Sequence, residues 1–418
     1  MNTARPHTAG PAPAAAHNDA NAVRLLHDLV ATPSVSGDER AAVECFVEHL
    51  RALGYRAHID AAGNAVGERG GPDGADILLL GHIDTVPGDI PVRIEGDTLH
   101  GRGSVDAKGS LAAFAIAGAR AELPPGARLT VIGAVGEEAD SPGAAFVRDH
   151  SDPPIACVIG EPSGWDRCTL GYKGRLVVEA AFTRPCAHSS GPDATAPERA
   201  VAWWSTLRDD AEALNTARAD AGVFDTLQIT LQRIDTTSDG LTETTTAEIG
   251  YRLPTWITPE TLESRLRTIS LPPLPPGERP GEGDAQSTTR AQTHAHTTTA
   301  ALPGHTGVPT HHPISLRFRA HAPCVRTDRS NALARAFFGA IADAGGRPRA
   351  VVKTGTSDMN TVGAHWGCPI VAYGPGDSAL DHTPEERLDI PEYLRSIDVL
   401  RRAIESLGAE IATASRSR

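Results

Sequence analysis

The chain has no long apolar run, and this absence limits the class of protein it can be. Nowhere in its 418 residues is there an apolar stretch approaching the roughly 20 residues that a membrane-spanning helix needs. The first 18 residues also lack the apolar centre of a secretory signal. We therefore expect a cytoplasmic protein that does not enter a membrane.

Positive charge is in short supply, which excludes a second class of partner. The formal net charge is -13, whereas nucleic acids and anionic membrane surfaces attract clustered basic residues. Neither is expected as the main partner. Only three of the 39 basic residues are Lys, and Lys108, Lys173 and Lys353 all lie in Gly-containing segments. This placement suggests a preference for sites, although three residues are also compatible with chance.

Paired cysteines are absent as well. The six cysteines are scattered along the chain without a CxxC pair or a short-range framework. A disulfide-stabilised scaffold is therefore excluded, and we expect reduced, mostly buried thiols.

A chain of this length is expected to form two domains rather than one core. Helical periodicity alternates with strand patterns in the N-terminal part, which predicts an α/β fold with a mostly parallel sheet. The predicted helices there are 20–29, 39–53 and 108–123, and the strands are 55–59, 77–81, 129–135 and 155–160. The same alternation returns with a helix at 330–344, a strand at 370–373 and a helix at 391–407.

The middle of the chain follows a different order. Its pattern is β-α-β-β-α-β, which predicts a ferredoxin-like α+β domain inserted into the first. The strands are expected at 175–182, 224–233, 244–253 and 314–319, and the helices at 198–214 and 259–269. The Pro-, Gly- and Thr-rich residues 271–312 and the tail 1–18 cannot bury enough apolar area to become ordered. The predicted division is a catalytic metal-binding domain (19–170 and 323–418) and a lid or dimerisation domain (171–322).

Metal-binding residue types occur just past the ends of predicted strands. His82 and Asp84 follow one apolar run, Glu137 and Glu138 follow another, and Glu161 follows a third. In open α/β sheets, loops at the carboxyl ends of the strands converge on a crevice where sites are built. Closely spaced carboxylates repel each other, and a divalent cation neutralises them. The sequence therefore predicts a metal site at this edge.

Each of these motifs also has a structural explanation when it stands alone. An isolated HxD pair is more often structural than not, Asp106 is placed as a helix cap, and His382 as a surface residue before the last helix. The adjacent Glu137 and Glu138 are harder to explain in this way. Neighbouring carboxylates that end a buried strand need different roles, such as one metal ligand and one base.

Taken together, these segments resemble the M20 family of dinuclear metallopeptidases and deacylases over about residues 20–270 and 313–410. The resemblance implies two divalent metal ions, Zn²⁺ or Co²⁺. In the family, residues matching His82 and Glu161 hold the first ion and those matching Glu138 and His382 hold the second. A residue matching Asp106 bridges the two.

The same resemblance implies roles for the neighbouring residues. Asp84 matches the carboxylate that supports the ligands, and Glu137 matches the general base that takes a proton from water and gives it to the leaving amine. The peptide bond that follows the bridging aspartate, here Asp106-Ala107, is commonly cis in the family.

Several runs narrow the resemblance to one branch of the family. GHIDTVPGDIPV, GRGSVDAKG, GEPSGW, TLGYKGR and KTGTSDMN are similar to the branch that releases lysine or ornithine from the terminal glutamate side chain of an amino-group carrier protein. This implies substrate contacts by Lys173, Arg252, Gly355 and Thr356. It also implies a homodimer in which His188 reaches the partner subunit's site and steadies the oxyanion. A polar surface residue is the alternative for His188.

Other functions remain open at this point. N-acetylornithine deacetylation, succinyl-diaminopimelate desuccinylation and dipeptide cleavage use the same kind of metal site. A nucleotide-binding module fails on detail, because Lys108 precedes Gly109 and Ser110, whereas a phosphate loop needs Gly directly before Lys and a hydroxyl directly after it. A metal-binding scaffold without catalysis would have no need for Glu137.

Overall fold

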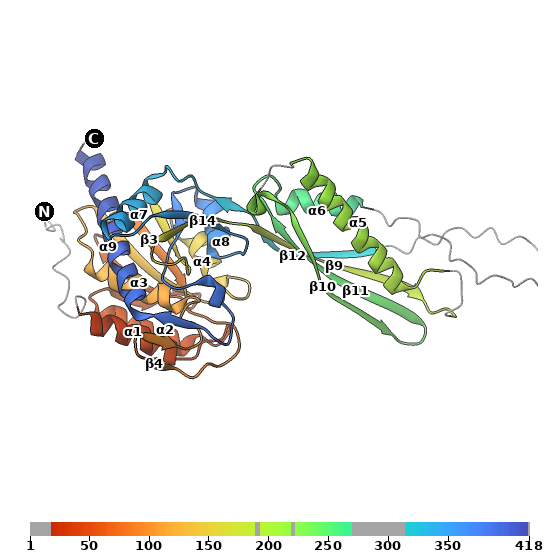
Figure 1. The fold of residues 1–418 in the computed structure, drawn as a ribbon, viewed down its shortest axis with the longest axis horizontal. Coiled ribbons are helices and arrows are strands. Elements are labelled where there is room, and N and C mark those ends of the chain that lie inside the picture. Colours follow the sequence, from red (N-terminus) through yellow and green to blue (C-terminus); the bar gives the residue numbers. More distant parts are fainter. Residues whose placement is uncertain (1–17, 189–192, 219–221, 270–313, 417–418) are drawn as a thin grey trace, which may run out of the picture.

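The computed structural model describes residues 18–188, 193–218, 222–269 and 314–416. Figure 1 shows a large α/β body that carries the chain ends and a narrower α+β body projecting from it. The predicted insertion at 271–312 lies outside the described residues, as does the predicted tail up to residue 17. Asn18, which was predicted to belong to this tail, is described and caps the first helix, because its side chain accepts a hydrogen bond of 2.9 Å from the amide of Ala20.

A nine-stranded sheet forms the centre of the α/β body. Its order is β1-β2-β6-β3-β7-β15-β8-β13, with β14 also paired to β8. The central strands β6, β3, β7 and β15 are parallel, as predicted, and antiparallel pairs lie toward both edges. The strands are β1 (Arg56–Ile59), β2 (Ala65–Gly70), β3 (Ala75–His82), β6 (Ala127–Ala134), β7 (Ala156–Gly160), β8 (Arg167–Tyr172), β13 (Val325–Arg326), β14 (Arg349–Lys353) and β15 (Ile370–Ala372).

Helices cover both faces of this sheet. Successive strand residues point to opposite faces, so Ile77 and Leu79 of β3 pack in one core cluster and Leu78 and Leu80 in another. This explains the continuous apolar run, which is typical of a strand buried on both faces. One cluster includes α1 (Asp19–Ala31), α2 (Arg40–Ala52), α3 (Lys108–Arg120), α7 (Ala332–Asp343) and α9 (Ile390–Arg416); the other includes α4 (Pro142–His150) and α8 (Asp358–Trp366).

Helix α3 lies unusually close to the strands that it covers. A Cβ on Gly160 of β7 would lie 2.9 Å from the Cα of Gly81 on β3 and 3.0 Å from a ring carbon of Phe114 on α3. Only glycine fits at such a distance. Helix α3 therefore packs directly against β3 and β7.

A small antiparallel sheet joins two distant parts of the α/β body. It has the order β16-β5-β4 and consists of β4 (Arg93–Glu95), β5 (Thr98–His100) and β16 (Arg387–Asp389). The pairing of β16 with β5 brings the segment before α9 next to the segment that leads into α3.

The projecting body has the predicted ferredoxin-like order. Its antiparallel sheet runs β10-β11-β9-β12, and α5 and α6 cover one face (Figure 1). Trp203 of α5 packs in its core with Phe182 and Tyr251 from the sheet. The elements are β9 (Gly174–Pro185), α5 (Ala196–Thr216), β10 (Gln228–Ser238), β11 (Thr242–Leu253), α6 (Pro259–Thr268) and β12 (Ile314–Ala322).

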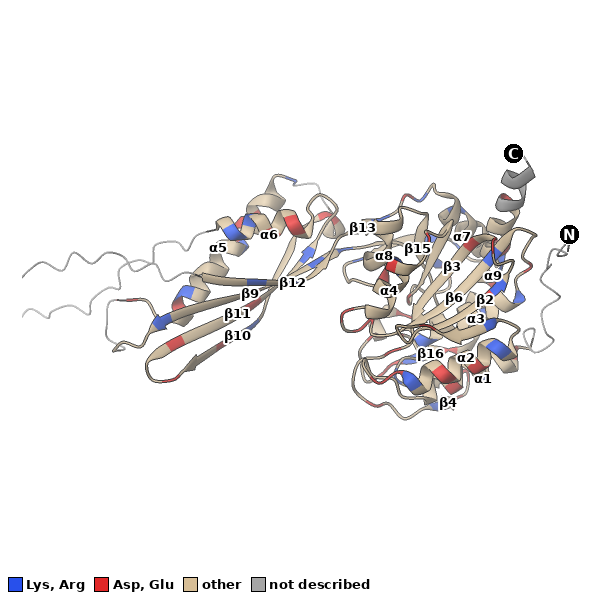
Figure 2. Ribbon diagram, turned by 180° about the vertical axis from the view of Figure 1, so that it is seen from behind, with Lys and Arg blue, Asp and Glu red and all other residues tan. Residues whose placement is uncertain are grey.

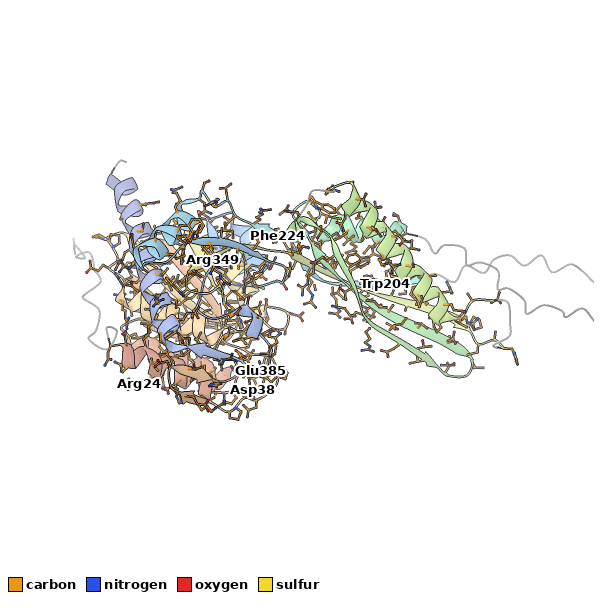
Figure 3. All side chains as sticks on the ribbon, viewed as in Figure 1. Arg24, Asp38, Trp204, Phe224, Arg349 and Glu385 are labelled. Atoms are coloured by element: carbon orange, nitrogen blue, oxygen red, sulfur yellow. The ribbon has the colours of Figure 1, made fainter. Side chains whose placement is uncertain are left out.

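The strand predicted from residue 224 is wrong at its start. Residues Val223–Asp225 form a 3-10 turn, and β10 begins only at Gln228. Two side chains hold this turn: the Lys173 ammonium donates to the Val223 carbonyl at 2.9 Å, and the indole of Trp256 donates to the Asp225 carbonyl at 2.8 Å. Phe224 lies at the end of the projecting body that faces the α/β body (Figure 3).

The prediction for the cysteines is confirmed in one respect and wrong in another. All six are free thiols. Only Cys157 and Cys168 are buried, however, and Cys186 is exposed, so the thiols are not mostly buried.

The surface and the helices agree with the composition. Figure 2 shows Lys and Arg interspersed with Asp and Glu over both bodies. Among the residues that the structure describes, no helix combines the length and the apolar character needed to cross a membrane.

Candidate metal centre

The site lies at the carboxyl ends of the parallel strands. His82 is the last residue of β3, Glu137 and Glu138 follow β6, and Glu161 follows β7 directly. His382 arrives on the loop between β15 and β16. Because these strands run in the same direction side by side, their ends deliver residues that are far apart in the sequence to one edge of the sheet.

Asp106 lies between two imidazoles. His82 Nε2 is 3.1 Å from Asp106 Oδ1, and His382 Nε2 is 3.1 Å from Asp106 Oδ2. His382 Nε2 is also 3.0 Å from Glu138 Oε1. Potential ligand atoms of His82, Asp106 and Glu138 all lie within 4.8 Å of one another. The carboxylate placed between two histidines is the arrangement that a shared, two-ion site requires.

The peptide bond between Asp106 and Ala107 is cis, as the family resemblance implies. His382 has a backbone φ of 59°, in the left-handed region that is uncommon for a residue with a side chain. Asp106 and His382 therefore both lie at uncommon backbone conformations.

The charges of the site are mutually dependent. Burial alone would raise the pKa of Asp106, but hydrogen bonds from His382 and His82 hold it well below its usual range. Burial lowers the pKa of His82, but hydrogen bonds to Asp106 and Asp84 outweigh it and raise the pKa well above its ordinary value. The hydrogen bond to Asp106 raises the pKa of His382 to about 9.

Three glutamates in the site have raised pKa values, in contrast to Asp106. Burial raises the pKa of Glu137, Glu138 and Glu161, and for Glu138 and Glu161 the nearby Asp106 raises it further. Such carboxylates are costly as anions unless a cation compensates them. A donor set of imidazole nitrogens and carboxylate oxygens suits Zn²⁺ or a similar divalent ion, so the residues present fit a metal centre.

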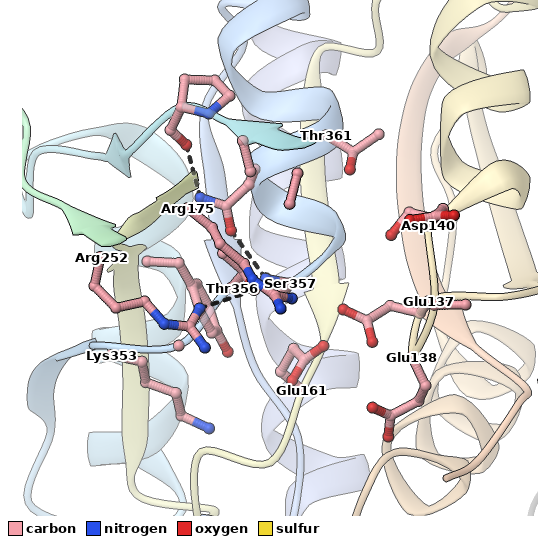
Figure 4. Close-up of a pocket in the computed structure, with 18 of the residues that line it drawn as sticks. Glu137, Glu138, Asp140, Glu161, Arg175, Arg252, Lys353, Thr356, Ser357 and Thr361 are labelled. Carbon is pink, nitrogen blue, oxygen red and sulfur yellow. Dashed lines mark hydrogen bonds between the residues drawn. The ribbon is translucent and has the colours of Figure 1, made fainter. Parts of the chain in front are cut away.

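Glu161 is placed at the wall of the site rather than in the tight cluster. It is 8% exposed and lines the same cavity as Glu138, but it is not among the residues whose ligand atoms lie within 4.8 Å of one another. Its carboxyl group is directed into the same space as those of Glu137 and Glu138 (Figure 4).

Asp84 supports the site in a way that the sequence did not reveal. His82 Nδ1 is 3.1 Å from the Asp84 carbonyl oxygen and 3.4 Å from its carboxylate, so both groups of Asp84 lie beside this ring nitrogen. The carboxylate also accepts hydrogen bonds from the amides of Glu137, at 3.0 Å, and Glu138, at 3.1 Å. A further bond of 2.7 Å comes from the Ser36 hydroxyl. Asp84 thus fixes the loop that carries both glutamates.

A cavity of about 1240 Å³ opens beside these carboxylates. Its lining includes Glu137, Glu138, Glu161 and His382 on one side. Figure 4 shows Arg252 and Lys353 across the cavity from the glutamates. A space of this size accommodates a substrate much larger than a free amino acid.

The predicted substrate residues divide into two groups. Arg252 on β11 donates a hydrogen bond of 3.2 Å to the Thr356 hydroxyl, and both line the cavity together with Gly355. Lys173 is not among the lining residues. Its ammonium donates to the carbonyl oxygens of Val223 and Thr226 and to Gln228 Oε1, which is 3.0 Å away. Contact with a substrate carboxylate would require Lys173 to leave these partners.

His188 lies far from its own chain's cavity. It is exposed and comes three positions after the end of β9 (Gly174–Pro185). A 12-residue strand spans about 40 Å, and β9 runs away from the α/β body (Figure 1). The structure therefore does not bring His188 together with the other predicted site residues of the same chain.

Several residues of the cavity wall were given no specific role by the sequence. Lys353, Arg175 and Asp381 all line it. The Lys353 ammonium donates to the carbonyl of Pro162, next to Glu161. Burial and the nearby Asp106 raise the pKa of Asp381 to about 8. The position of Lys353 in a Gly-containing segment was a usable signal, whereas Arg175 and Asp381 had none.

The fold and the site define a metal-dependent hydrolase of amide or peptide bonds. The chain belongs to peptidase family M20/M25/M40, whose family model matches residues 78–406. It is 42% identical over 397 residues to a LysW-lysine hydrolase from Deinococcus radiodurans, which covers 93% of this chain and 98% of that relative. A LysW-lysine/LysW-ornithine hydrolase from Sulfurisphaera tokodaii is 24% identical, with 92% and 94% covered.

Solved structures show the same fold. An M20 family metallo-carboxypeptidase from Sulfolobus solfataricus superposes with a TM-score of 0.64 at 16% identity, covering 93% of this chain and 99% of that one. A dinuclear metal-binding peptidase of the M20 family from Bacillus subtilis gives a TM-score of 0.62 at 12% identity, with 94% and 98% covered.

Proposed function

We propose that this protein hydrolyses the amide that joins lysine or ornithine to the terminal glutamate side chain of an amino-group carrier protein. The observation that carries the proposal is the carboxylate-bridged pair His82 and His382 beside Glu137, at the edge of a large cavity that also holds Arg252. The names of the similar proteins from Deinococcus radiodurans and Sulfurisphaera tokodaii support this substrate.

We propose two divalent ions, Zn²⁺ or Co²⁺, as cofactors. His82 and Glu161 would hold one and His382 and Glu138 the other, with Asp106 shared between them. Bound there, the ions would supply Lewis acidity that polarises the amide carbonyl and makes water more acidic.

The chain's own groups perform the proton transfers. Glu137 follows β6 within the cavity wall, close to the ligands and fixed through its backbone amide by Asp84. It accepts the proton of the attacking water and delivers it to the departing amine. The raised pKa that burial gives Glu137 suits a group that must hold this proton between the two steps.

Arg252, Thr356 and Gly355 form the proposed binding place for the carboxylate of the released amino acid. A guanidinium and a hydroxyl that already share a hydrogen bond of 3.2 Å present donors to one point of the cavity. Lys173 supports this region from behind by holding the Val223 and Thr226 carbonyls next to Phe224.

We propose a homodimer in which each subunit lends His188 to the other's cavity. The length and direction of β9 keep His188 away from its own site. Strand β10 is an outer strand of its sheet, and Leu241 at its turn is 80% exposed. Both are typical of a surface that pairs with another chain. His188 then donates to the oxyanion that forms during attack.

We propose that the two bodies correspond to two domains with different functions. Residues 19–170 and 323–418 form the catalytic part, and 171–322 form the lid and dimerisation part. A cytoplasmic location, which suits a biosynthetic enzyme, also belongs to this proposal.

The test compares substrates side by side with the purified protein. Carrier-linked lysine, carrier-linked ornithine, N-acetylornithine and N-succinyl-diaminopimelate are each assayed with and without chelator. We expect hydrolysis of a carrier-linked substrate, loss of activity with chelator and its return with Zn²⁺ or Co²⁺. Preferential cleavage of N-acetylornithine or N-succinyl-diaminopimelate would contradict the carrier assignment while leaving the hydrolytic chemistry in place.

A further inference from the structure

Five segments deliver the ligands of the proposed metal centre, and one ion pair joins three of them. Strand β3 ends at His82 and continues into a loop, the segment before α3 carries Asp106, and the loop before β16 carries His382. Beneath them, Arg102 Nη1 lies 2.8 Å from Glu386 Oε2. The two side chains are 13% and 0% exposed, so the pair is withdrawn from solvent.

Glu386 holds the segment that presents Asp106. Its Oε1 accepts hydrogen bonds from the backbone amides of Val105, at 2.9 Å, and Asp106, at 3.1 Å. Its own carbonyl accepts from the amide of Gly101 at 3.4 Å. One side chain thus fixes the backbone of the bridging residue while its other oxygen is bound to Arg102.

Arg102 extends the same connection to the other two loops. Its Nε donates to the Gly88 carbonyl at 3.0 Å, in the loop after His82 and Asp84. Its Nη1 donates to the Thr383 carbonyl at 3.2 Å, directly after His382. The planar guanidinium can serve these directions at once, which the single ammonium of a lysine cannot do.

Arg102 binds the backbone next to residues that have left-handed conformations. His382 has its φ of 59° in the left-handed region, and such a residue keeps this conformation only if its surroundings enforce it. Thr383 is held from both sides, because its amide and hydroxyl donate to the Leu380 carbonyl while its carbonyl accepts from Arg102. Gly88 also has a left-handed backbone, with a φ of +114°, and it packs closely on Arg102: a Cβ there would lie 3.3 Å from Arg102 Nη2.

An ordinary buried ion pair would not be arranged in this way. Such pairs contribute little net stability because desolvation offsets their attraction, so their placement needs another explanation. Within the described part of the chain, the other side-chain hydrogen bonds of this pair go to backbone groups of the segments that follow His82, carry Asp106 and follow His382. Groups that orient ligands from behind are known to affect metal affinity strongly.

We propose that Arg102 and Glu386 are positioning residues that set the separation of Asp106 and His382, and thereby the affinity of the site for its second divalent cation. Neither side chain is among the residues that line the cavity, so neither is placed to touch a reacting atom. The proposal rests on the metal-dependent function above only in requiring that the site bind divalent ions, and it does not depend on the substrate.

The test uses full-length protein in which Glu386→Gln removes the charge but keeps an oxygen for the Val105 and Asp106 amides. Arg102→Lys keeps the positive charge but removes the planar guanidinium. The matched control is Arg128→Gln, which removes a 3.0 Å pair with Asp76 at the opposite end of β3, the strand that carries His82. Binding of Co²⁺ and Zn²⁺ is measured by competition with a chelator, with the visible spectrum of the Co²⁺ form and thermal unfolding of the metal-free form.

We expect both site variants to bind the second ion about 10- to 100-fold more weakly, with an altered Co²⁺ spectrum. The control should lower Tm alone, with affinity within about twofold of the original protein. Unchanged affinity and spectrum in a folded Glu386→Gln protein would overturn the proposal. So would failure of both site variants to fold, because the pair would then serve the fold rather than the site. Since no substrate enters these measurements, a negative result is distinct from a failure of the proposed function.

Discussion

His382 Nε2 lies 3.0 Å from Glu138 Oε1, although the two residues are 244 positions apart in the chain. Glu138 follows β6 and His382 lies between β15 and β16, and the pairing of the strands brings both to the same edge of the large sheet. The contact links the two ends of the catalytic part across the whole inserted body. A substitution of either residue should therefore change the pKa of the other.

Replacing Glu137 by Gln should abolish turnover without loss of metal. The amide keeps the size of the side chain but cannot accept and return a proton, so kcat should fall by about 100-fold or more. Metal content is measured by elemental analysis and kcat with carrier-linked lysine. Asp140→Asn is the matched control, because Asp140 lines the same cavity and should leave kcat largely unchanged. A Glu137→Gln protein that retains more than a few per cent of activity would exclude the base.

Mixing two inactive variants should restore activity if His188 acts across a dimer. His188→Ala lacks the donor and Glu137→Gln lacks the base, so each homodimer is inactive. In a mixed dimer, one cavity combines an intact Glu137 with the partner's His188. Random exchange gives about a quarter of the original activity, since half of the dimers are mixed and each has one complete site. Absence of recovery in verified mixed dimers would assign His188 to the surface.

Removing the Arg252 guanidinium should weaken substrate binding more than it slows the chemistry. Arg252→Ala loses charge-assisted hydrogen bonds beside Thr356, which corresponds to about a 10- to 100-fold rise in KM. Arg317→Ala, at an exposed position of β12, is the control. Steady-state kinetics with carrier-linked lysine separates KM from kcat. An equal, small effect of both variants would place the carboxylate elsewhere.

Metal removal should make stability depend on pH. Burial raises the pKa of Glu137 and Glu161, so the folded metal-free protein binds more protons than the unfolded chain above the ordinary pKa of 4.5. The hydrogen bond to Asp106 raises the pKa of His382 from 6.5 to about 9, which acts in the same direction. The contribution of His382 is fully present below pH 6.5 and is lost as pH rises through about 9. The Tm of chelator-treated protein should therefore fall over this range.

The metal-loaded protein is the control for this measurement. Bound cations compensate the same carboxylates and hold the imidazoles neutral, so its Tm should change less between pH 6.5 and about 9. A Tm of the metal-free protein that rises with pH over this range would contradict the assigned directions.

Much of the fold was predictable because strand and helix patterns reflect local burial. The run that includes Leu78–Leu80 predicted β3, since a strand covered on both faces must be apolar throughout. The elements that were missed, such as α4 and α8, are nine residues long and carry polar residues at the cavity. The start of β10 was misplaced because Lys173, 50 positions away, binds the Val223 carbonyl.

Individual roles at the site were less predictable than its composition. The family resemblance gave Asp84 a supporting role, but it did not show that its carboxylate accepts the amides of Glu137 and Glu138. No spacing rule connects Asp84 to a loop more than 50 positions later. Lys173 was assigned to the substrate, but its ammonium is committed to carbonyl oxygens outside the cavity.

The sequence by itself determined the alternation of elements, the inserted ferredoxin-like unit and the supply of imidazoles and carboxylates at strand ends, because periodicity and residue chemistry are local properties. Only the tertiary structure decided which of these groups meet. The position of Asp106 between His82 and His382, the support from Arg102 and Glu386, and the distance of His188 all depend on how strands pair and loops approach. Such contacts arise between residues far apart in the chain, where no periodic signal records them.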